Sequence, residues 1–357
     1  MDQLKQARAA INAIDEKMAA LFEARMQAVE DVLAYKLAHH LPVLDESREQ
    51  EVLERNCALL QNQDLREYYA QYQKALMEVS KRYQRAQLYH DTVGYQGIEG
   101  AFSYIATTHL FPEEKKVAYQ TFAEVFRAVA NKVIAYGVIP FENSYTGEVG
   151  EVLDLLFEYD VHIVGSYDLA IDQYLLGVPG ATIADIKQIY SHHQAISQCQ
   201  EYLNRLQVEV VPYANTALAA KYVSEANDKT KAAIASAETA GLFGLAILAG
   251  KINTSAQNTT RFMVIAAEEK LDGNRFNLLF TVGHNAGQLA NVMGIIGEFG
   301  FNLESIKSRP LRHLPWQYYF YVEVIGQLDD PHTQALLAKL RQTCDSLKVL
   351  GSYTIPI

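Results

Sequence analysis

The chain has 357 residues, 49% of them hydrophobic, which is more than one hydrophobic core usually organises, so several folded domains are expected. A formal net charge of −11, without a basic stripe interleaved with aromatic residues, argues against a nucleic-acid-binding protein. The most apolar tract, residues 232–250, is interrupted by Glu238, and the N-terminus has no apolar signal core, so no membrane segment is expected.

Cysteine and histidine spacing argues against bound metals and disulfides. Cys57, Cys199 and Cys344 lie far apart in the sequence and form no CxxC pair, which indicates a reduced, cytoplasmic protein. The histidine pairs at 39–40 and 192–193 are sequence neighbours, and neighbours share neither a helix face nor a strand face. No metal site is therefore predicted.

Residues 1–90 are expected to be helical, because Pro42 is the only proline or glycine before Gly94. Residues spaced alternately by three and four form one helical seam. Its members are Arg8, Ile11, Asp15, Met18, Phe22, Arg25, Val29, Val32 and Lys36. Three cations on a seam that should be buried indicate a bound anion, since a buried charge needs a partner. Snorkelling at a solvated edge is the alternative for any one of them.

The spacing along this helix predicts a dimer. Arg8 and Arg25 are separated by roughly 25 Å if the helix is straight, at about 1.5 Å per residue, so they cannot hold one small ligand together. If they share a site, a second copy of the helix must supply one of them. An intertwined homodimer is therefore expected, and a tetramer is the alternative.

Two further helices are predicted in this unit. The second begins after Pro42 with Asp45 as N-cap and carries Arg48 and Glu49 in its first turn. The third covers residues 65–89. It places two hydrogen-bonding side chains on one face at i and i+4: Ser80 and Gln84.

Segments 8–17 and 45–49 resemble the motifs of the all-helical chorismate mutase family. The resemblance implies that three arginines bind the two carboxylates of chorismate: Arg8, Arg25 and Arg48. It implies two catalytic groups on the ether oxygen whose bond breaks: Lys36 and Gln84. It implies three further contacts, two of them to the ring hydroxyl: Asp45, Glu49 and Ser80. The rearrangement is intramolecular and needs no nucleophile, so fixed cations that stabilise charge on an oxygen suit it.

From about residue 91 the pattern changes to short β-like runs and glycine-bearing turns. Gly94, Gly97 and Gly100 do not form the GxGxxG pattern of a dinucleotide site, so no nicotinamide cofactor is predicted. A buried strand over 133–140 leads into the polar turn 141–147 and then into a helix.

A second α/β lobe is expected to begin near Ile171. Polar strand-to-helix turns follow at 191–194, 215–216 and 236, and the strand 258–265 opens with hydroxyls beside Arg261. Ligands of α/β sheets bind at such strand ends, so a cleft between two lobes is predicted. A binding protein and an enzyme look alike at this level.

These turns resemble prephenate dehydratase over residues 91–267, most specifically at 258–262. The resemblance implies that Thr260 is catalytic and that Arg261 binds a substrate carboxylate. It also implies a cleft lined by Asn143, Ser144, Ser191, Gln194, Thr216 and Ser236. Glu142 and His192 are further candidates for proton handling. A threonine hydroxyl is a poor acid, so Thr260 is interpreted as a positioned donor within a network.

Three positions depart from the usual pattern of that family: Ala101, His193 and Asn215 stand where a hydroxyl residue, a proline and a serine are usual. The implied reaction releases the ring carboxylate as carbon dioxide and the ring hydroxyl as water, giving phenylpyruvate.

Residues 274–357 read as strand, helix, strand, strand, helix, strand, an α+β ferredoxin-like order. The expected elements cover 276–282, 287–299, 303–309, 318–324, 331–347 and 349–353. The stretch resembles an ACT domain, an amino-acid-sensing module. The resemblance implies that phenylalanine binds across a dimer interface at Gly287, Leu289, Ser308, Arg309 and Pro310. Gln288 and Lys307 replace the usual alanine and glutamate, and a purely structural dimerisation module is the alternative.

The three resemblances together predict a multidomain, bifunctional enzyme of phenylalanine biosynthesis, without cofactor, inhibited by phenylalanine. The alternative from another class is an amino-acid-binding regulator whose catalytic sites have decayed. A prephenate dehydrogenase is disfavoured, because the sequence offers no nucleotide-binding turn.

Overall fold

The computed structural model describes residues 2–38, 46–89, 92–255, 257–311, 314 and 316–355. The chain forms two compact units, Met1–His90 and Asp91–Ile357, each of which is considered by itself. Across these described ranges, no helix combines the length and the apolar character needed to cross a bilayer.

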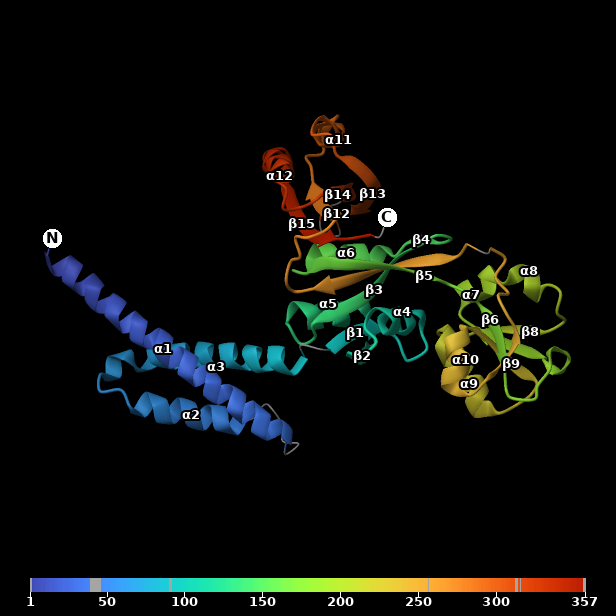
Figure 1. The fold of residues 1–357 in the computed structure, drawn as a ribbon, viewed down its shortest axis with the longest axis horizontal. Helices are drawn as coiled ribbons and strands as arrows, with labels where there is room; N and C mark the ends of the chain where they lie inside the picture. The colour runs from blue at the N-terminus through green and yellow to red at the C-terminus, as the bar shows by residue number, and fades with distance from the viewer. Residues whose placement is uncertain are drawn as a thin grey trace. The chain divides into compact units, whose positions relative to one another are not determined.

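The first unit is helical, as the sequence predicts. Its elements are α1 (Asp2–Ala38), α2 (Glu46–Ala58), the short 3-10 helix η1 (Gln63–Leu65) and α3 (Arg66–Tyr89). Helices α1 and α2 both contact α3 (Figure 1). The predicted N-cap Asp45 lies outside the described residues.

Helix α1 exposes most of its apolar seam. Eight of its large hydrophobic side chains are each more than 40% exposed: Leu4, Ile11, Ile14, Met18, Leu21, Phe22, Val32 and Tyr35. Among the described side chains of this unit, Leu33 and Cys57 are the buried hydrophobic ones. The unit therefore lacks a complete core within one chain.

The first lobe of the second unit is an α/β layer structure. Its elements are β1 (Thr92–Gln96), α4 (Phe102–Leu110), β2 (Lys115–Tyr119), α5 (Phe122–Ala130), β3 (Tyr136–Asn143), β4 (Gly147–Glu148), α6 (Gly150–Glu158), β5 (His162–Ala170) and β11 (Thr259–Ala266). The sheet order is β2-β1-β3-β11-β5, with β4 beside β3. β1, β2 and β3 are parallel, and β11 is antiparallel to both β3 and β5. The strand predicted at 133–140 begins and ends about three residues later, so Glu142 and Asn143 belong to it.

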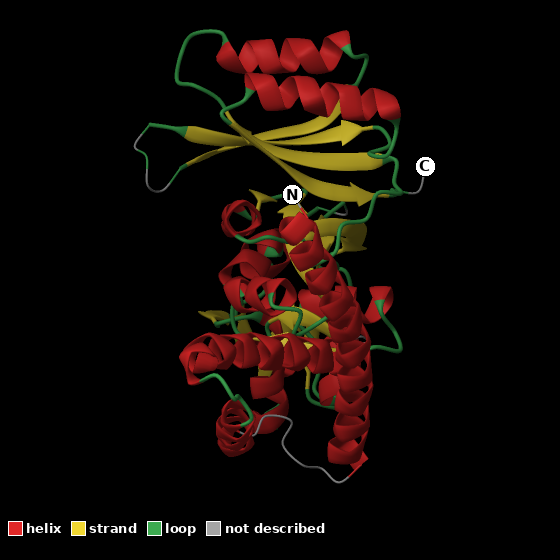
Figure 2. Cartoon of the chain, turned by 90° about the vertical axis from the view of Figure 1, so that its left-hand side faces the viewer, coloured by secondary structure: helices red, strands yellow, loops and turns green. Residues whose placement is uncertain are grey.

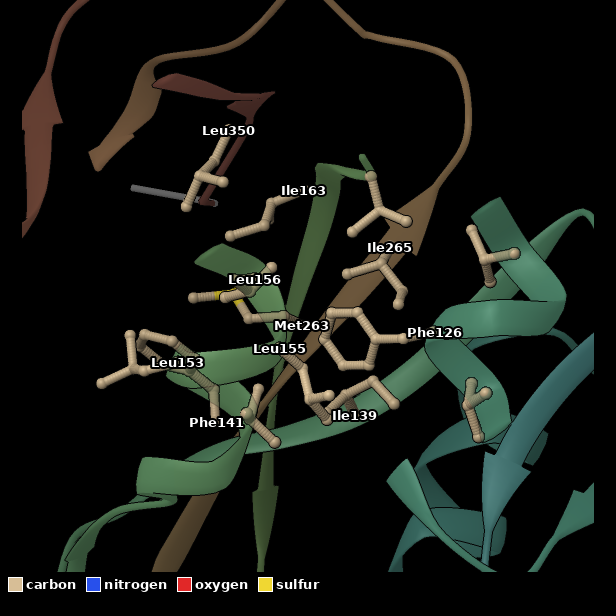
Figure 3. Packing of buried hydrophobic residues seen from close by; sticks show 14 of the residues in the cluster. Phe126, Ile139, Phe141, Leu153, Leu155, Leu156, Ile163, Met263, Ile265 and Leu350 are labelled. Atoms are coloured by element: carbon tan, nitrogen blue, oxygen red, sulfur yellow. The ribbon is translucent and has the colours of Figure 1, made fainter. Parts of the chain in front are cut away.

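The two faces of β11 are distinguished by their packing. Phe262 joins one buried cluster, with Val93 and Ile105. Met263 and Ile265 join another, larger cluster on the opposite face, which Figure 3 shows in part. This alternation follows from the two-residue period of a strand.

The second lobe carries a mixed sheet of order β10-β6-β9-β7-β8. Its elements are β6 (Tyr174–Gly177), η2 (Ile183–Asp185), β7 (Gln188–Ser191), α7 (His193–Gln198), α8 (Gln200–Leu203), β8 (Glu209–Pro212), α9 (Thr216–Ala226), β9 (Lys231–Ala235), α10 (Ala237–Phe243) and β10 (Ala246–Ala249). The lobe begins just after Ile171, as predicted. The chain crosses between lobes twice, and these crossings are tied together: the Ile171 amide donates to the Asn258 carbonyl at 2.8 Å.

The C-terminal domain has the predicted ferredoxin-like order. Its elements are β12 (Arg275–Thr281), α11 (Gln288–Glu298), β13 (Asn302–Pro310), β14 (Tyr318–Ile325), α12 (Pro331–Thr343) and β15 (Ser346–Tyr353). The sheet order is β13-β14-β12-β15, all antiparallel, with both helices on one face (Figure 2). The last helix was expected to reach residue 347. It ends four residues earlier, because Leu347 pairs with Phe280 in the sheet.

The other face of this sheet packs against the first lobe. Tyr321 and Leu350 share one buried cluster with Phe141 and Ile163, and Figure 3 shows Leu350 above Ile163. The approach is close at Gly351, where an added Cβ would come 2.5 Å from the Ile163 carbonyl oxygen. The C-terminal domain therefore completes the core of the first lobe.

Candidate active site

Parallel strands of the second lobe bring its polar turns to one edge. β7 is parallel to both β8 and β9, so their carboxyl ends meet at the same side of the sheet. Ser191 ends β7, Thr216 opens α9 after β8, and Ser236 caps α10 after β9. This edge therefore gathers three of the predicted cleft residues.

The first lobe contributes a buried amide-hydroxyl pair. Asn143 and Thr260 are register partners on β3 and β11, and are 6% and 9% exposed. Asn143 Nδ2 donates to Thr260 Oγ1 at 2.9 Å and to Asn258 Oδ1 at 2.8 Å. Asn143 Oδ1 accepts from the amides of Tyr145 and Thr146, both at 3.0 Å. Because Thr260 Oγ1 accepts from Asn143, its own O–H can donate to a ligand.

Two hydrogen bonds join the lobes, and one of them ends on Thr146, whose amide bonds Asn143. Gln194 Nε2 in the second lobe donates to Thr146 Oγ1 in the first at 3.1 Å. Thr239 Oγ1, buried in the second lobe, donates to the Gly100 carbonyl at 2.8 Å. The two polar edges therefore face each other, and the predicted interlobe site has a geometric basis.

Other predicted cleft residues use their hydroxyls to brace the local structure. Ser144 Oγ donates to the Gln257 carbonyl and accepts from the Thr259 amide, both at 3.0 Å. Ser191 Oγ donates to the Ile234 carbonyl at 2.7 Å. Ser236 Oγ accepts from the Thr239 amide at 3.2 Å. These contacts hold the strand ends in place.

Arg261 and Glu142 do not lie with Thr260. Both point to the opposite face of the sheet, because adjacent strand residues alternate and a bulge separates the pairing of Arg261 from that of Phe262. The expectation that the two side chains share one cleft with Thr260 is therefore corrected.

On that face Arg261 bridges two carboxylates. Its Nε donates to Asp168 Oδ1 at 3.0 Å, and its Nη1 lies 3.7 Å from Glu323 Oε2 on β14. The bond to Asp168 raises the pKa of Arg261, and burial raises the pKa of Glu323. Glu142 pairs with Lys307 on β13 at 2.7 Å.

His192 caps α7, and its Nδ1 accepts from the Gln194 amide at 3.4 Å. Burial, and next the neighbouring His193, lower the pKa of His192, so the ring is neutral near pH 7. Ala101 occupies the N-cap of α4 without a side-chain cap, whereas Asn215 caps α9 by accepting from the Leu218 amide at 2.7 Å. The asparagine thus caps the helix at the position where that family usually has a serine.

In the helical unit the structure brings α1 and α3 together at three of the predicted residues, through two hydrogen bonds. Arg25 donates to the buried Ser80 hydroxyl, and Gln84 Nε2 donates to the Val29 carbonyl at 3.4 Å. Lys36 is half-buried and Arg8 is exposed. The side chains of Arg48 and Glu49, like Asp45, lie outside the described set.

A cavity of about 410 Å³ lies in the C-terminal domain. Its lining includes Gln288, Leu289 and Phe320. Gly287, the residue before Gln288, is the N-cap of α11 and has the left-handed backbone conformation. Ser308 and Pro310 pair in register with two lining residues, Phe320 and Tyr318.

Arg309, in contrast, makes bonds of 3.1 and 2.8 Å to Asp154 on α6. Of the five residues predicted to bind phenylalanine, Arg309 is therefore turned toward the first lobe.

Sequence reasoning missed three residues of the interlobe network: Thr146, Thr239 and Asn258. Thr239 follows the capping serine by three residues, a spacing that could have suggested the bond from its amide to Ser236 Oγ but not the bond from its hydroxyl to the other lobe. In the residues that the structure covers, no three His, Cys, Asp or Glu side chains are grouped to hold a metal.

Comparison with known proteins gives two family matches. Residues 93–270 match the prephenate dehydratase model, and residues 7–85 match the chorismate mutase type II model. The bifunctional chorismate mutase/prephenate dehydratase of Aquifex aeolicus is 30% identical over 366 aligned positions, covering 99% of this chain and 98% of that protein.

Two solved structures resemble the second unit. GqqA, described as a novel type of quorum quenching acylase, is 30% identical with a TM-score of 0.69, covering 74% of this chain and 98% of that one. The prephenate dehydratase of Staphylococcus aureus is 30% identical with a TM-score of 0.65, covering 73% and 99%.

Proposed function

The chain belongs to the bifunctional chorismate mutase/prephenate dehydratase family, and we propose that residues 1–90 convert chorismate to prephenate and residues 91–267 convert prephenate to phenylpyruvate. Residues 274–357 would impose feedback inhibition by phenylalanine. The three unpaired cysteines favour a reducing compartment such as the cytoplasm.

The dehydratase proposal is carried by the Asn143–Thr260 hydrogen bond at the facing edges of two lobes. In the reaction, the bond to the ring carboxylate breaks and releases carbon dioxide, while its electron pair enters the ring. The ring C–O bond breaks, and the departing hydroxide takes a proton that comes ultimately from solvent and leaves as water. Thr260 would donate a hydrogen bond to that oxygen, with Asn143 fixing the direction of its hydroxyl.

Neutral His192 could not supply a proton at pH 7 but could accept one. Arg261 and Glu142 face away from this pair, so the proposal gives them no contact with substrate. Ser191, Gln194, Thr216 and Ser236 would line the second-lobe side, where anion or hydroxyl groups of prephenate would bind.

The mutase proposal rests on cations along α1 and on hydrogen-bonding side chains of α3 that face them. Arg25 is fixed by Ser80, which prepares its guanidinium for a carboxylate. Lys36 and Gln84 would stabilise the ether oxygen. The proposed site is completed by Arg48, Asp45 and Glu49, and by Arg8 of a second copy of the chain.

The exposed seam of α1 supports the homodimer. Leu4, Ile11 and Met18 are 58%, 56% and 43% exposed, and covering them would bury a continuous apolar stripe. A second α1 would bring its own Arg8 beside Arg25, which the separation along one helix forbids within one chain.

The regulatory proposal rests on the C-terminal cavity. Its volume of about 410 Å³ suits one amino acid, and Leu289 and Phe320 offer apolar surface for an aromatic side chain. Gly287 adjoins the lining residue Gln288 in the sequence, and Ser308 and Pro310 pair in the sheet with the lining residues Phe320 and Tyr318, whereas Arg309 contacts Asp154.

The test is to give the purified protein chorismate alone and to follow chorismate loss and phenylpyruvate gain, with and without phenylalanine. Chorismate loss and phenylpyruvate gain are both expected, and phenylalanine is expected to suppress both. Prephenate accumulation would refute the dehydratase assignment. Phenylalanine binding without turnover would instead favour the amino-acid-binding regulator.

A further inference from the structure

Two charged residues of the C-terminal domain reach the strands that carry the proposed dehydratase site. Lys307, with a side chain 9% exposed, pairs with Glu142 at 2.7 Å. Glu323, 1% exposed, lies 3.7 Å from Arg261. Both pairs join the C-terminal sheet to the ends of β3 and β11.

The ion-pair partners of Lys307 and Glu323 are sequence neighbours of the hydrogen-bonded pair Asn143 and Thr260. Glu142 precedes Asn143, and Arg261 follows Thr260. In the sheet register, Arg261 opposes Glu142 and Thr260 opposes Asn143. Because successive residues point to opposite faces, holding a side chain on the back face fixes the rotation of the strand and therefore the direction of the front-face neighbour.

A β-bulge near the end of β3 makes this segment sensitive to the side chains that pack on the sheet face opposite Thr260. The pairing shifts between Arg261 and Phe262, so β3 has one extra residue there. Phe141 at the bulge is 1% exposed, and its ring lies 5.2 Å from that of Tyr321 on β14. Bulges re-aim side chains, so the C-terminal sheet supports the segment that directs Asn143.

Two groups in contact with Glu323 stabilise its negative charge. Tyr353 donates a hydrogen bond to it, and Arg261 is the cation paired with it. A buried carboxylate requires such partners, which restrains Arg261 from one side while Asp168 restrains it from the other.

We propose that Lys307 and Glu323 are positioning residues for the dehydratase reaction, acting through Glu142 and Arg261 on the Asn143–Thr260 hydrogen bond. The inference rests on the proposed role of that pair. It gives the C-terminal domain a part in catalysis when no phenylalanine is bound.

The test measures prephenate conversion by full-length Lys307→Met and Glu323→Gln without phenylalanine. Each is expected to lower kcat about tenfold, since small misplacements of a catalytic group reduce rate steeply, with KM for prephenate and the mutase rate unchanged. Lys307→Arg keeps the charge and should retain the wild-type kcat.

The matched control is Asp154→Asn. It breaks the contacts of Asp154 with Arg309, at 3.1 and 2.8 Å, which also join the two domains but end on helix α6. Its kcat should stay at the wild-type value. An equal loss of kcat in this control would overturn the proposal, because any weakening of the interface would then suffice.

Thr260→Val, measured in parallel, separates this inference from the proposed function. If it abolishes conversion while Lys307→Met and Glu323→Gln keep wild-type kcat, only the positioning role fails. If Thr260→Val itself converts prephenate normally, the proposed site fails and the positioning role with it.

Discussion

The two units of this chain differ in how much of a core one copy can build. Residues 92–355 contain every buried hydrophobic cluster found among the described residues, including one shared by the first lobe and the C-terminal sheet. The helical unit instead exposes apolar residues along most of α1. A site in the second unit can therefore be assembled by one chain, whereas the helical unit needs a second surface.

The difference also appears in how charges are held. Arg261 is bracketed by Asp168 and Glu323 within one chain. Arg8 lies exposed on a helix whose apolar neighbours are exposed too. Predictions about the first unit therefore concern association, and predictions about the second concern internal geometry.

The largest expected effect is on dehydratase activity in Thr260→Val. This change keeps the shape of the side chain and removes the donor at the leaving oxygen. Loss of such a donor typically costs about 10²–10³ in rate. Phenylpyruvate formation from prephenate should fall by that factor, while chorismate consumption stays at the wild-type rate. Near-normal phenylpyruvate formation would contradict the assignment.

Next in size is the stability of the second unit in Arg261→Met. Glu323 would then be a buried charge without its cation, which costs about 3 kcal/mol or more. Calorimetry should show a lower unfolding temperature, partly restored in Arg261→Met with Glu323→Gln. An unchanged unfolding temperature with a raised KM for prephenate would instead favour the sequence-based interpretation that Arg261 binds substrate.

Much of the second unit could be predicted from the sequence, because strands, turns and caps are local features. The order of strands and helices, the start of the second lobe and the polar turns at 215 and 236 all follow from short patterns; that Asn215 and Ser236 cap the helices there is seen in the structure. The pairing of Asn143 with Thr260 could be expected only as membership of one cleft. Their direct bond depends on the register between distant strands.

The orientation of Arg261 shows what was missed. Strand alternation alone separates it from Thr260, so that part was available in the sequence. Its partners were not, because Glu323 reaches it only when the C-terminal sheet packs on the first lobe. The bond from Thr239 to Gly100 likewise depends on how two lobes meet.

A smaller effect is expected when the exposed seam of α1 is charged. Ile11→Asp places a carboxylate on an apolar face, which should prevent a second copy from covering it. Mutase activity should fall by about tenfold, since the penalty for burying such a group exceeds 1.4 kcal/mol. Dehydratase activity should persist. Light scattering measures the change in oligomeric state.

The matched control for that variant is Ala20→Asp. Ala20 is also exposed, and nine residues place it on the opposite side of α1 from Ile11. It adds the same charge to the same helix and should leave mutase activity intact. Equal losses in both variants would indicate damage to the helix and not a lost partner.

The smallest expected effect is a pH-dependent difference between Glu323→Gln and the wild type. Burial raises the pKa of Glu323 above 4.5, against the lowering influence of Tyr353 and Arg261; Glu304 raises it and Arg275 lowers it. A raised carboxyl pKa gives stability that is fully present below the unfolded value and is lost as pH rises through the folded one. Glutamine cannot ionise, so this loss is absent from the variant.

As the pH rises above 4.5, the unfolding temperature of Glu323→Gln should therefore increase relative to that of the wild type, by a degree or two at most. Arg261 keeps Asp168 as a partner in this variant, so no unpaired cation offsets the gain. A lowered kcat in a protein of undiminished stability would show that Glu323 acts on the geometry of the site and not on the integrity of the unit. A drop in unfolding temperature at pH 8 would mean that the ion pair with Arg261 stabilises the fold, and the rate change would then need no separate cause.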